Sequence, residues 1–459
     1  MVRKNLSFFT LKSSSRVLIH KGLHHSREVF NPCIGKCKFH VEVKKKKMLP
    51  TTNHHIETEI EDRTEDIAGR SGHGHRHTVD KSTRIIPDTK LGGYEFWKSI
   101  GSPKHVVAPM VDQSELAFRI LAHNHGAHLA YTPMFHSKVF KNDETYRTLH
   151  FQFLENEGPV FAQFCANDPD TFVECGWLAW EMSNHKISAI DLNLGCPQRI
   201  AKKGRYGSYI MENFDLVYSL INKAHKELPV PVTAKIRIFE DIELTLKYVD
   251  TVVSAGAQVL CVHGRTRDQR GHNQNYADWE VIKLIREHVP QIPVIANGNV
   301  RMYQDVLDCL EYTGVDAVMS AEPLLCNPAL FNGGTHICPI ELCDQYLDIC
   351  ERYPPPEHSF VKRHIFHILD RPIGTQNHFR AMLGNAHNME QYRKFVNYLK
   401  GQKETLYLDA PQYEPSIMVV RDPANHPIDK KPKGRGCQQV DLNEEEASSA
   451  LDRIANTSR

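Results

Sequence analysis

Residues 191–198 read Asp-Leu-Asn-Leu-Gly-Cys-Pro-Gln and close a mainly apolar run that begins at Ile187. Such a run predicts a buried strand that ends in a tight Gly-Cys-Pro turn. The turn lifts the thiol of Cys196 out of the strand, and the side chain of Asn193 is expected to point into the same cavity. A thiol at the C-terminal end of a buried strand is placed for chemistry. The alternative is that Cys196 is a small buried apolar residue.

Eight short apolar runs of this kind recur from His105 onwards, and a helix-like stretch follows each of them. The first of these stretches is predicted to begin with Ser114 as its N-cap and to end at Gly126. Strict alternation of strand and helix predicts a parallel sheet, and eight such units predict a closed (β/α)8 TIM barrel of the α/β class. The eight runs cover residues 105–110, 129–133, 160–165, 189–195, 230–238, 259–265, 294–300 and 317–322.

The segments on either side of this barrel have a different composition. Residues 1–100 hold few periodic apolar segments and are predicted to be a largely disordered N-terminal extension, which places the barrel at residues 101–338. Residues 339–410 read as a small all-helical domain, with helices expected at residues 340–353, 359–369, 377–383 and 389–400. Residues 411–459 read as a proline-containing basic tail with Lys430, Lys431, Lys433 and Arg435.

The composition limits the partners of the chain. Its 459 residues carry 56 Lys and Arg against 55 Asp and Glu, so a polyanion has to be held by local basic patches and not by a global field. No apolar run approaches the roughly 18 residues that span a bilayer, and we expect no membrane partner. The 12 cysteines are scattered, which favours free thiols in a reducing compartment.

The N-terminal extension contains two further patterns. The run 72–77 is rich in histidine, and Cys33 and Cys37 lie near His40, but neither group has the paired spacing of a structural zinc site and we expect no metal. The first 27 residues hold six basic side chains and no acid, a composition typical of a mitochondrial transit peptide. An unstructured basic arm, or leader sequence upstream of a start at Met48, is the alternative. The expected location is the cytoplasm, the nucleus or both, with the mitochondrion left open by this stretch.

Six of the eight predicted strands carry polar side chains near the same end. Buried parallel strands normally read as apolar runs, and barrel enzymes place their chemistry at the C-terminal ends of the strands. A single glutamine or histidine in such a place is more often a satisfied core residue, whereas a whole set at one mouth indicates a site. The set comprises Gln163, Asn193, Lys235, Arg237, His263, Asn297, Asn299 and Glu322.

These residue types suit a phosphorylated flavin. A cation such as Lys235 beside the N1/C2 carbonyl edge of a flavin stabilises the negative charge of its reduced form. Gln163 and Asn193 offer paired donors and acceptors for the edge of a ring. Gly298 and Ala321 are small residues in the loops after the seventh and eighth strands, where the backbone N–H groups of barrels bind phosphate. FMN fits this set, although the spacing does not exclude another phosphorylated cofactor.

Six short segments occur in a fixed order, namely Ala108–Val111, Asp191–Gln198, Ala234–Arg237, Val262–Thr266, Asn297–Asn299 and Ser320–Glu322. Together they resemble the tRNA-dihydrouridine synthase family, and the likeness runs from about residue 103 to about residue 400. Cys196-Pro-Gln-Arg-Ile-Ala201 and Glu322 are most similar to the eukaryotic branch that acts at uridines 16 and 17 of the tRNA D-loop. The N-terminal extension and the basic tail depart from the family pattern.

The resemblance implies an FMN-bound barrel that reduces the C5=C6 bond of a uridine in tRNA, with NADPH or NADH recharging the flavin. It implies that Cys196 protonates C5 after a hydride reaches C6. A thiol with a pKa of about 8.5 suits that role because it is mostly protonated at pH 7. Asn193 and Arg237 are implied to hold the uracil or nearby groups. The implied FMN contacts are Pro109, Met110, Val111, Gln163, Lys235, His263, Asn297, Gly298, Asn299, Ala321 and Glu322.

Two basic clusters are candidates for contacts to the tRNA, on which the chain is expected to act as a monomer. The first directly follows Cys196, and we interpret it as a mobile RNA-contacting loop, with a solvated loop as the alternative. It consists of Arg199, Lys202, Lys203 and Arg205. The second lies in the helical domain, where RNA contact and a solvated face are equally good interpretations. It consists of Lys362, Arg363 and His364.

Two other functions stay open at this point. An FMN barrel that reduces a free pyrimidine or an enoate shares the cofactor residues but needs neither the helical domain nor the basic loop after Cys196. A tRNA-binding factor without essential catalysis is expected to lose Cys196 or Lys235, and both residues are present.

Overall fold

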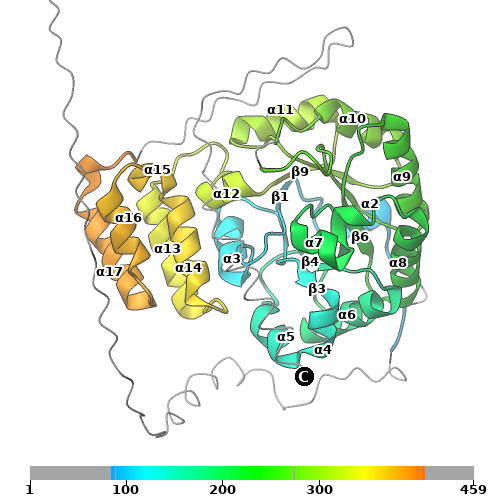
Figure 1. The fold of residues 1–459 in the computed structure, drawn as a ribbon, viewed down its shortest axis with the longest axis horizontal. Coiled ribbons are helices and arrows are strands. Elements are labelled where there is room, and N and C mark those ends of the chain that lie inside the picture. Colours follow the sequence, from blue (N-terminus) through cyan, green and yellow to red (C-terminus); the bar gives the residue numbers. More distant parts are fainter. Residues whose placement is uncertain (1–83, 88, 272–273, 409–459) are drawn as a thin grey trace, which may run out of the picture. The chain divides into compact units, whose positions relative to one another are not determined.

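The computed structural model describes residues 84–87, 89–271 and 274–408, and its centre is a ring of parallel strands (Figure 1). The strands follow the order β2-β1-β9-β8-β7-β6-β5-β4, and the pairing of β2 with β4 closes the ring. This arrangement confirms the predicted TIM barrel. The two-residue strand β3, which the sequence analysis missed, pairs with β4 outside the ring. The bounds are β1 (His105–Val107), β2 (Leu129–Tyr131), β3 (Phe135–His136), β4 (Val160–Cys165), β5 (Ala189–Leu194), β6 (Val232–Arg237), β7 (Leu260–His263), β8 (Val294–Asn297) and β9 (Ala317–Ser320).

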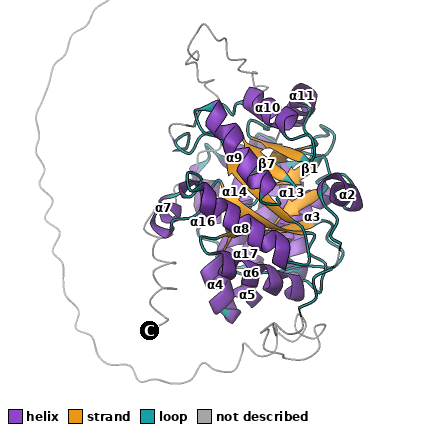
Figure 2. Cartoon of the chain, turned by 90° about the vertical axis from the view of Figure 1, so that its right-hand side faces the viewer, coloured by secondary structure: helices purple, strands orange, loops and turns teal. Residues whose placement is uncertain are grey.

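Helices alternate with the strands and cover the outside of the ring (Figures 1 and 2). Asp168, Asn213, Asp241 and Asp278 are N-caps whose side chains accept hydrogen bonds from first-turn N–H groups of α6, α8, α9 and α10. The barrel helices are α3 (Leu116–Asn124), α4 (Ser137–Asn142), α5 (Glu144–His150), α6 (Pro169–Met182), α7 (Arg199–Gly204), α8 (Phe214–Glu227), α9 (Ile242–Ser254), α10 (Trp279–His288), α11 (Tyr303–Thr313) and α12 (Glu322–Cys326).

Helix α3 begins one residue later than the sequence predicted. Its N-cap is Glu115, whereas the hydroxyl of Ser114 is hydrogen-bonded to the backbone N–H and carbonyl of Met110, at 3.0 and 3.2 Å. The helix ends at Asn124 with His125 as its C-cap, and the predicted Gly126 follows directly. Gly126 has a φ of +91°, and a Cβ there would lie 2.5 Å from the carbonyl oxygen of Phe331. Only glycine fits this turn without moving the neighbouring backbone.

Helix α2 (Gly93–Ser99) packs at the N-terminal end of the barrel, inside the segment predicted to be disordered. Phe96 and Trp97 belong to the same buried cluster as barrel residues such as Phe161. The backbone N–H of Gly93 donates to the side chain of Gln258, which lies just before β7. The ordered part of the chain therefore begins earlier than residue 101, because two aromatic side chains of α2 are buried against the barrel.

The region after the barrel is helical, as predicted. Arg393 of α17 joins α17 to α13, because its guanidinium pairs with Asp344, Asp348 and Glu351 at 2.9, 2.7 and 2.8 Å. The helices are α13 (Pro339–Arg352), α14 (His358–Ile368), α15 (Asp370–Ile373), α16 (Asn377–Gly384) and α17 (Met389–Lys400).

Other predictions concern residues outside the described ranges. They are the candidate transit segment, the histidine-rich run 72–77, the group of Cys33, Cys37 and His40, and the basic tail at residues 430–435. None of the helices in the described part of the chain is long and apolar enough to cross a membrane.

Candidate active site

The register of the sheet brings the predicted polar residues of five neighbouring strands, β4 to β8, to a common end. Because these strands are parallel, their C-terminal ends meet at one mouth of the barrel. The register places Gln163 opposite Asp191, Asn193 opposite Lys235, Arg237 opposite His263, and His263 opposite Asn297.

A chain of buried hydrogen bonds connects the barrel interior to the thiol turn. The carboxylate of Asp191 accepts from the hydroxyl of Thr233 at 2.6 Å and from the amide of Gln163 at 2.8 Å. The side-chain oxygen of Gln163 accepts from the amide of Asn193 at 2.8 Å. Asn193 Oδ1 accepts from two successive backbone N–H groups, the second that of Cys196, at 3.1 and 2.9 Å. This local turn fixes the direction in which the chain leaves β5.

The environment of Cys196 favours a neutral thiol. Burial raises its pKa above the ordinary value, although the Gln198 backbone and nearby cations act in the opposite direction. The N–H and the hydroxyl of Ser208 both donate to the carbonyl of Cys196, at 3.1 and 3.0 Å. Gly207 has a φ of +61°, and a Cβ there would lie 3.0 Å from the Cβ of Cys196. A larger residue at position 207 would therefore displace the thiol.

Arg237 bridges the thiol turn and the loop after β7. Its guanidinium donates to the carbonyl of Gly195 at 2.9 Å, and to the carbonyls of Thr266 and Gln269 at 2.8 and 3.2 Å. The family resemblance implied that Arg237 helps to hold the uracil or nearby groups, and that role stays a prediction. In the structure its contacts hold the two loops together.

Arg270 and Tyr209 form a second bridge, which the sequence analysis missed. Arg270 donates to the carbonyl of Pro197 and, at 3.2 Å, to the hydroxyl of Tyr209. The Tyr209 hydroxyl also donates to the carbonyl of Pro197, at 2.9 Å. Tyr209 ends the short 3-10 helix Gly207–Tyr209 and Arg270 lies in a loop, and neither segment has an apolar period that would have predicted these contacts from the sequence.

Lys235 and Asn297 meet across the mouth. The ammonium of Lys235 donates to Asn297 Oδ1 at 2.8 Å, and the amide of Asn297 donates to the carbonyl of Met319 at 3.1 Å. Burial lowers the pKa of Lys235 from its ordinary value. The lysine of β6 is thus held in a fixed position by a residue of β8, on the far side of β7.

His263 is neutral in this arrangement. Arg265 donates to Nε2 of His263 at 2.9 Å, and a guanidinium can only donate, so Nε2 carries no proton. Burial and the surrounding cations lower the pKa of His263 well below its ordinary value, which agrees with a neutral ring. Arg265 also donates to Oδ1 of Asn299 at 2.9 Å, and Asn299 bonds both backbone groups of Ala277. The side chain of Asn299 therefore secures the loop after β7.

Gly298 allows a close approach of two loops. Its φ is +112°, and a Cβ there would lie 2.5 Å from the Cβ of Ala277 and 3.2 Å from the ring of His263. The last strand, β9, ends at Ser320, and Ala321 follows as the N-cap of α12, whose first residue is Glu322. In the segment after β1, Met110 is partly buried against the barrel interior, whereas the side chain of Val111 is 56% exposed.

The cations at the mouth repel one another. Burial, with smaller effects from Arg237 and Arg301, lowers the pKa of Arg265 to about 10, and burial also lowers that of Arg237 to about 10. Burial raises the pKa of the neighbouring Glu322. A group of cations that lower one another's pKa values fits an anionic ligand. FMN carries a phosphate and gains negative charge on reduction. The residues present therefore fit this cofactor.

The basic cluster after Cys196 forms a short helix and not the loop that the sequence suggested. Helix α7 stands out from the barrel, as Figure 2 shows, and Arg205 ends it with a φ of 54°. Four basic side chains of this cluster are exposed, namely Arg199, Lys202, Lys203 and Arg205.

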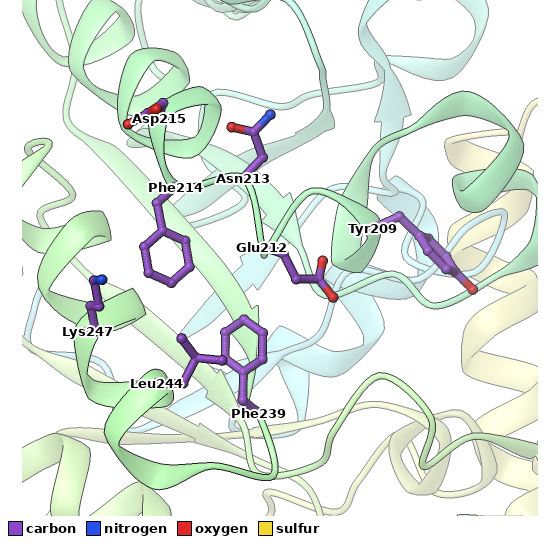
Figure 3. A pocket seen from close by; sticks show the side chains of 8 residues that line it. All are labelled: Tyr209, Glu212, Asn213, Phe214, Asp215, Phe239, Leu244 and Lys247. Atoms are coloured by element: carbon purple, nitrogen blue, oxygen red, sulfur yellow. The ribbon is translucent and has the colours of Figure 1, made fainter.

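A hollow of about 630 Å³ lies beside the mouth, between the start of α8 and the loop before α9 (Figure 3). It is not the expected flavin site, because none of the residues implied to bind FMN lines it. It borders the thiol turn through Tyr209, and Glu212 in its wall pairs with Arg267 at 2.5 Å. The lining residues are Tyr209, Glu212, Asn213, Phe214, Asp215, Phe239, Leu244 and Lys247.

The comparison with known families decides between the barrel enzymes that this geometry suits. A family model described as dihydrouridine synthase matches residues 106–409. The chain belongs to the dihydrouridine synthase family. The match begins within β1 and includes all the other strands of the ring, the thiol turn and all of α13 to α17, so both regions of the chain lie within the family match.

Three relatives of this chain carry the name tRNA-dihydrouridine(16/17) synthase or a synthase-like form of it. The Rattus norvegicus protein is 48% identical over 304 residues, which cover 66% of this chain and 68% of the relative. The Schizosaccharomyces pombe protein is 42% identical over 321 residues, or 67% of this chain and 79% of the relative. The Saccharomyces cerevisiae protein is 51% identical over 249 residues, or 53% of this chain and 58% of the relative. The match thus spans between about half and four fifths of these relatives.

Proposed function

We propose that this chain reduces the C5=C6 bond of uridines 16 and 17 in the D-loop of tRNA to dihydrouridine, with FMN as its flavin and NADPH or NADH as the reductant. The observation that carries the proposal is the neutral thiol of Cys196, held by a hydrogen-bonded turn at the mouth of the barrel beside the fixed cation Lys235. The relatives named for positions 16 and 17 support the choice of uridines.

The thiol supplies the proton that the reaction needs. When bound, FMN supplies a hydride to C6 of the uracil. The charge that then develops at C5 requires an acid that is still protonated at neutral pH, and burial keeps Cys196 in that form. A serine hydroxyl is a far weaker acid, and alanine has no proton to give.

The polar residues at the mouth would hold the flavin. Lys235, fixed by Asn297, offsets the negative charge of a reduced flavin, and neutral His263 keeps one ring N–H as a donor. Gly298 and Ala321 leave room for backbone N–H groups to approach a phosphate. The full proposed set is Pro109, Met110, Val111, Gln163, Lys235, His263, Asn297, Gly298, Asn299, Ala321 and Glu322.

The exposed cations of α7 suit the tRNA backbone. A uridine has to leave its stack to reach the mouth, which costs a few kcal/mol, and phosphate contacts offset that cost. Arg199, Lys202, Lys203 and Arg205 adjoin the thiol turn and are exposed. Asn193 and Arg237 contact the turn itself, and their contact with the uracil stays a prediction. A tRNA substrate is consistent with action in the cytoplasm or the nucleus, and we expect a monomer.

Neither alternative function is favoured. A reductase of a free pyrimidine or an enoate has no use for a basic helix directly after its acid, and the named relatives act on tRNA. A binding factor without catalysis has no use for a thiol turn held by Asn193, Ser208 and Arg237.

The test replaces Cys196 by alanine. The variant should still purify as yellow, FMN-bound protein, because Cys196 is not among the proposed flavin contacts. Its rate of dihydrouridine formation on unmodified tRNA should fall by about 10²- to 10⁴-fold, the usual contribution of an acid. Cys309→Ala is the matched control, since Cys309 is a buried cysteine of α11. A Cys196→Ala enzyme with the wild-type rate, or wild-type protein that binds no flavin, would contradict the proposal.

A further inference from the structure

Residues 110–115, which lead from the end of the segment after β1 into α3, form a tight turn with one residue in a left-handed conformation. Asp112 has a φ of +58°, a left-handed backbone conformation that is uncommon for residues other than glycine. The backbone N–H groups of Gln113 and Ser114 both donate to the carbonyl of Met110, at 3.1 Å each. This tight turn presents Met110 and Val111, two proposed flavin contacts. We call residues 110–115 the β1 loop.

Helix α14 contacts the β1 loop at three residues. Arg363 pairs with Asp112 at 3.1 Å, and His364 pairs with Glu115 at 2.9 Å. The third contact joins Nε2 of His367 to the side-chain amide of Gln113 at 3.0 Å. The three α14 residues share one side of the helix, since His367 lies four positions after Arg363 and three after His364, and both spacings bring side chains together. Contacts from the helical region thus hold the loop along most of its length.

The contact of His364 with Glu115 is fully buried. The side chains are 0% and 2% exposed, and the hydroxyl of Tyr346 donates to the other carboxylate oxygen of Glu115 at 2.6 Å. The ring of His364 also stacks on Phe118 of α3, with 4.6 Å between ring centroids. A buried pair with several partners fixes one geometry, because any displacement leaves a polar group unpaired. This pair therefore fixes the position of α14 relative to the start of α3.

The same helix packs against α12, which begins at Glu322, so it lies beside the loops after both β1 and β9 (Figure 1). Strands β1 and β9 are neighbours in the barrel, with Val106 opposite Met319. Both loops carry proposed flavin contacts. One helix of the C-terminal region therefore adjoins two adjacent walls of the proposed flavin site.

We propose that α14 is a positioning element of the flavin site: Arg363, His364 and His367 hold the β1 loop in the conformation that presents Met110 and Val111 to the flavin. The helical region then sets flavin affinity, whatever part it plays in binding RNA. The inference rests on the proposed function for the identity of the cofactor.

This role differs from the one that the sequence suggested for the cluster Lys362, Arg363 and His364. His364 is fully buried and cannot meet RNA, Arg363 is paired with the β1 loop, and Lys362 donates to the carbonyl of Gly384 at 2.9 Å. The three consecutive basic residues resembled an RNA-binding patch, because the loop that Arg363 and His364 contact lies about 250 residues away in sequence.

The test uses the two partly exposed contacts, which can be removed without opening the buried pair. Arg363→Met combined with His367→Phe removes one ion pair and one hydrogen bond, and should raise the FMN dissociation constant of the holoenzyme about tenfold. From the other side, Asp112→Asn removes the ion pair and keeps a residue that tolerates the left-handed conformation, and it should raise the constant about threefold. FMN release is followed by flavin fluorescence on dilution, together with the visible spectrum and the KM for tRNA.

Arg393→Met is the matched control, because Arg393 forms its ion pairs within the helical region. It should leave FMN affinity unchanged. An FMN dissociation constant that is the same in the wild type and in both loop variants overturns the inference. So does a raised KM for tRNA with unchanged flavin affinity in the Arg363→Met, His367→Phe enzyme, which would make α14 an RNA contact. Wild-type protein that binds no FMN would instead overturn the proposed function itself.

Discussion

Replacing Asn193 by alanine should disable the site while leaving the barrel folded. Asn193 makes three hydrogen bonds, one to Gln163 and two from backbone N–H groups of the thiol turn, at 2.8, 3.1 and 2.9 Å. Each group left without a partner costs about 1–3 kcal/mol when buried, and about 1 kcal/mol is the better figure here because water can reach the half-buried turn. The three lost hydrogen bonds together destabilise the one conformation that presents Cys196 by about 3 kcal/mol. If only that conformation reacts, the rate should fall about a hundredfold.

The assay is single-turnover formation of dihydrouridine in unmodified tRNA by enzyme whose flavin has already been reduced. This design removes flavin reduction from the measured rate. Asn193→Asp is the comparison, because a carboxylate still accepts from both N–H groups but cannot donate to Gln163. It should lose about tenfold, between the wild type and the alanine variant.

A rate for Asn193→Ala within about threefold of the wild type, with flavin retained, would refute this reasoning. It would mean that the contacts of Ser208 and Arg237 hold the thiol turn without help from the barrel interior. A melting temperature lowered by many degrees would equally show that Asn193 supports the whole barrel and not only the turn.

Three further predictions concern the flavin, the tRNA and pH. Lys235→Met should slow flavin reduction by NADPH or weaken FMN binding at least about tenfold, since a buried charge-assisted hydrogen bond is lost; unchanged stopped-flow reduction and affinity would argue against this role. Changing Lys202, Lys203 and Arg205 together should raise the KM for tRNA and reduce the slope of log KM against log salt concentration by about 2. An unaltered slope would show that α7 is a solvated face that does not contact the tRNA. Burial raises the pKa of Asp191 to about 6, so the folded state binds the proton more tightly than the unfolded state. Its contribution to the free energy of unfolding should therefore fall by about 2 kcal/mol as pH rises from 4 to 7, and denaturant titrations of Asp191→Asn should lack that fall.

The barrel was predictable because each strand is buried on both faces and reads as a continuous apolar run. Errors arose where a side chain has a tertiary partner. Ser114 has the chemistry of an N-cap, but its hydroxyl bonds Met110, and Glu115 takes the cap position because His364 and Tyr346 hold its carboxylate. Phe96 and Trp97 stand among polar residues in sequence, so only the barrel interior explains why α2 forms there.

The residue types of the site were also predictable, since polar side chains at the ends of buried strands are conspicuous. Their contacts were not. Gly207 packs on Cys196 and Arg270 donates to the carbonyl of Pro197, but both lie in segments without an apolar period. Nothing in the local sequence distinguishes them from solvent-exposed residues. Asn193 and Arg237 were recognised as site residues, but their contacts in the structure are with the turn.

The arginines beside Cys196 meet two opposing requirements of an acid catalyst. The turn has to be held firmly, and arginine is well suited to that because its guanidinium offers several donors in a fixed plane. A cation placed on the sulfur, however, would lower the pKa of the thiol and favour the thiolate, which is a nucleophile and not an acid. The structure separates the two effects, because Arg237 and Arg270 donate to the carbonyls of Gly195 and Pro197, the residues on either side of Cys196. Burial of the thiol then outweighs the more distant charges, and its pKa stays above the ordinary value. The position of the Cys196 thiol is therefore fixed through the backbone of its neighbours, and the sulfur keeps the proton that it is proposed to donate to the uracil.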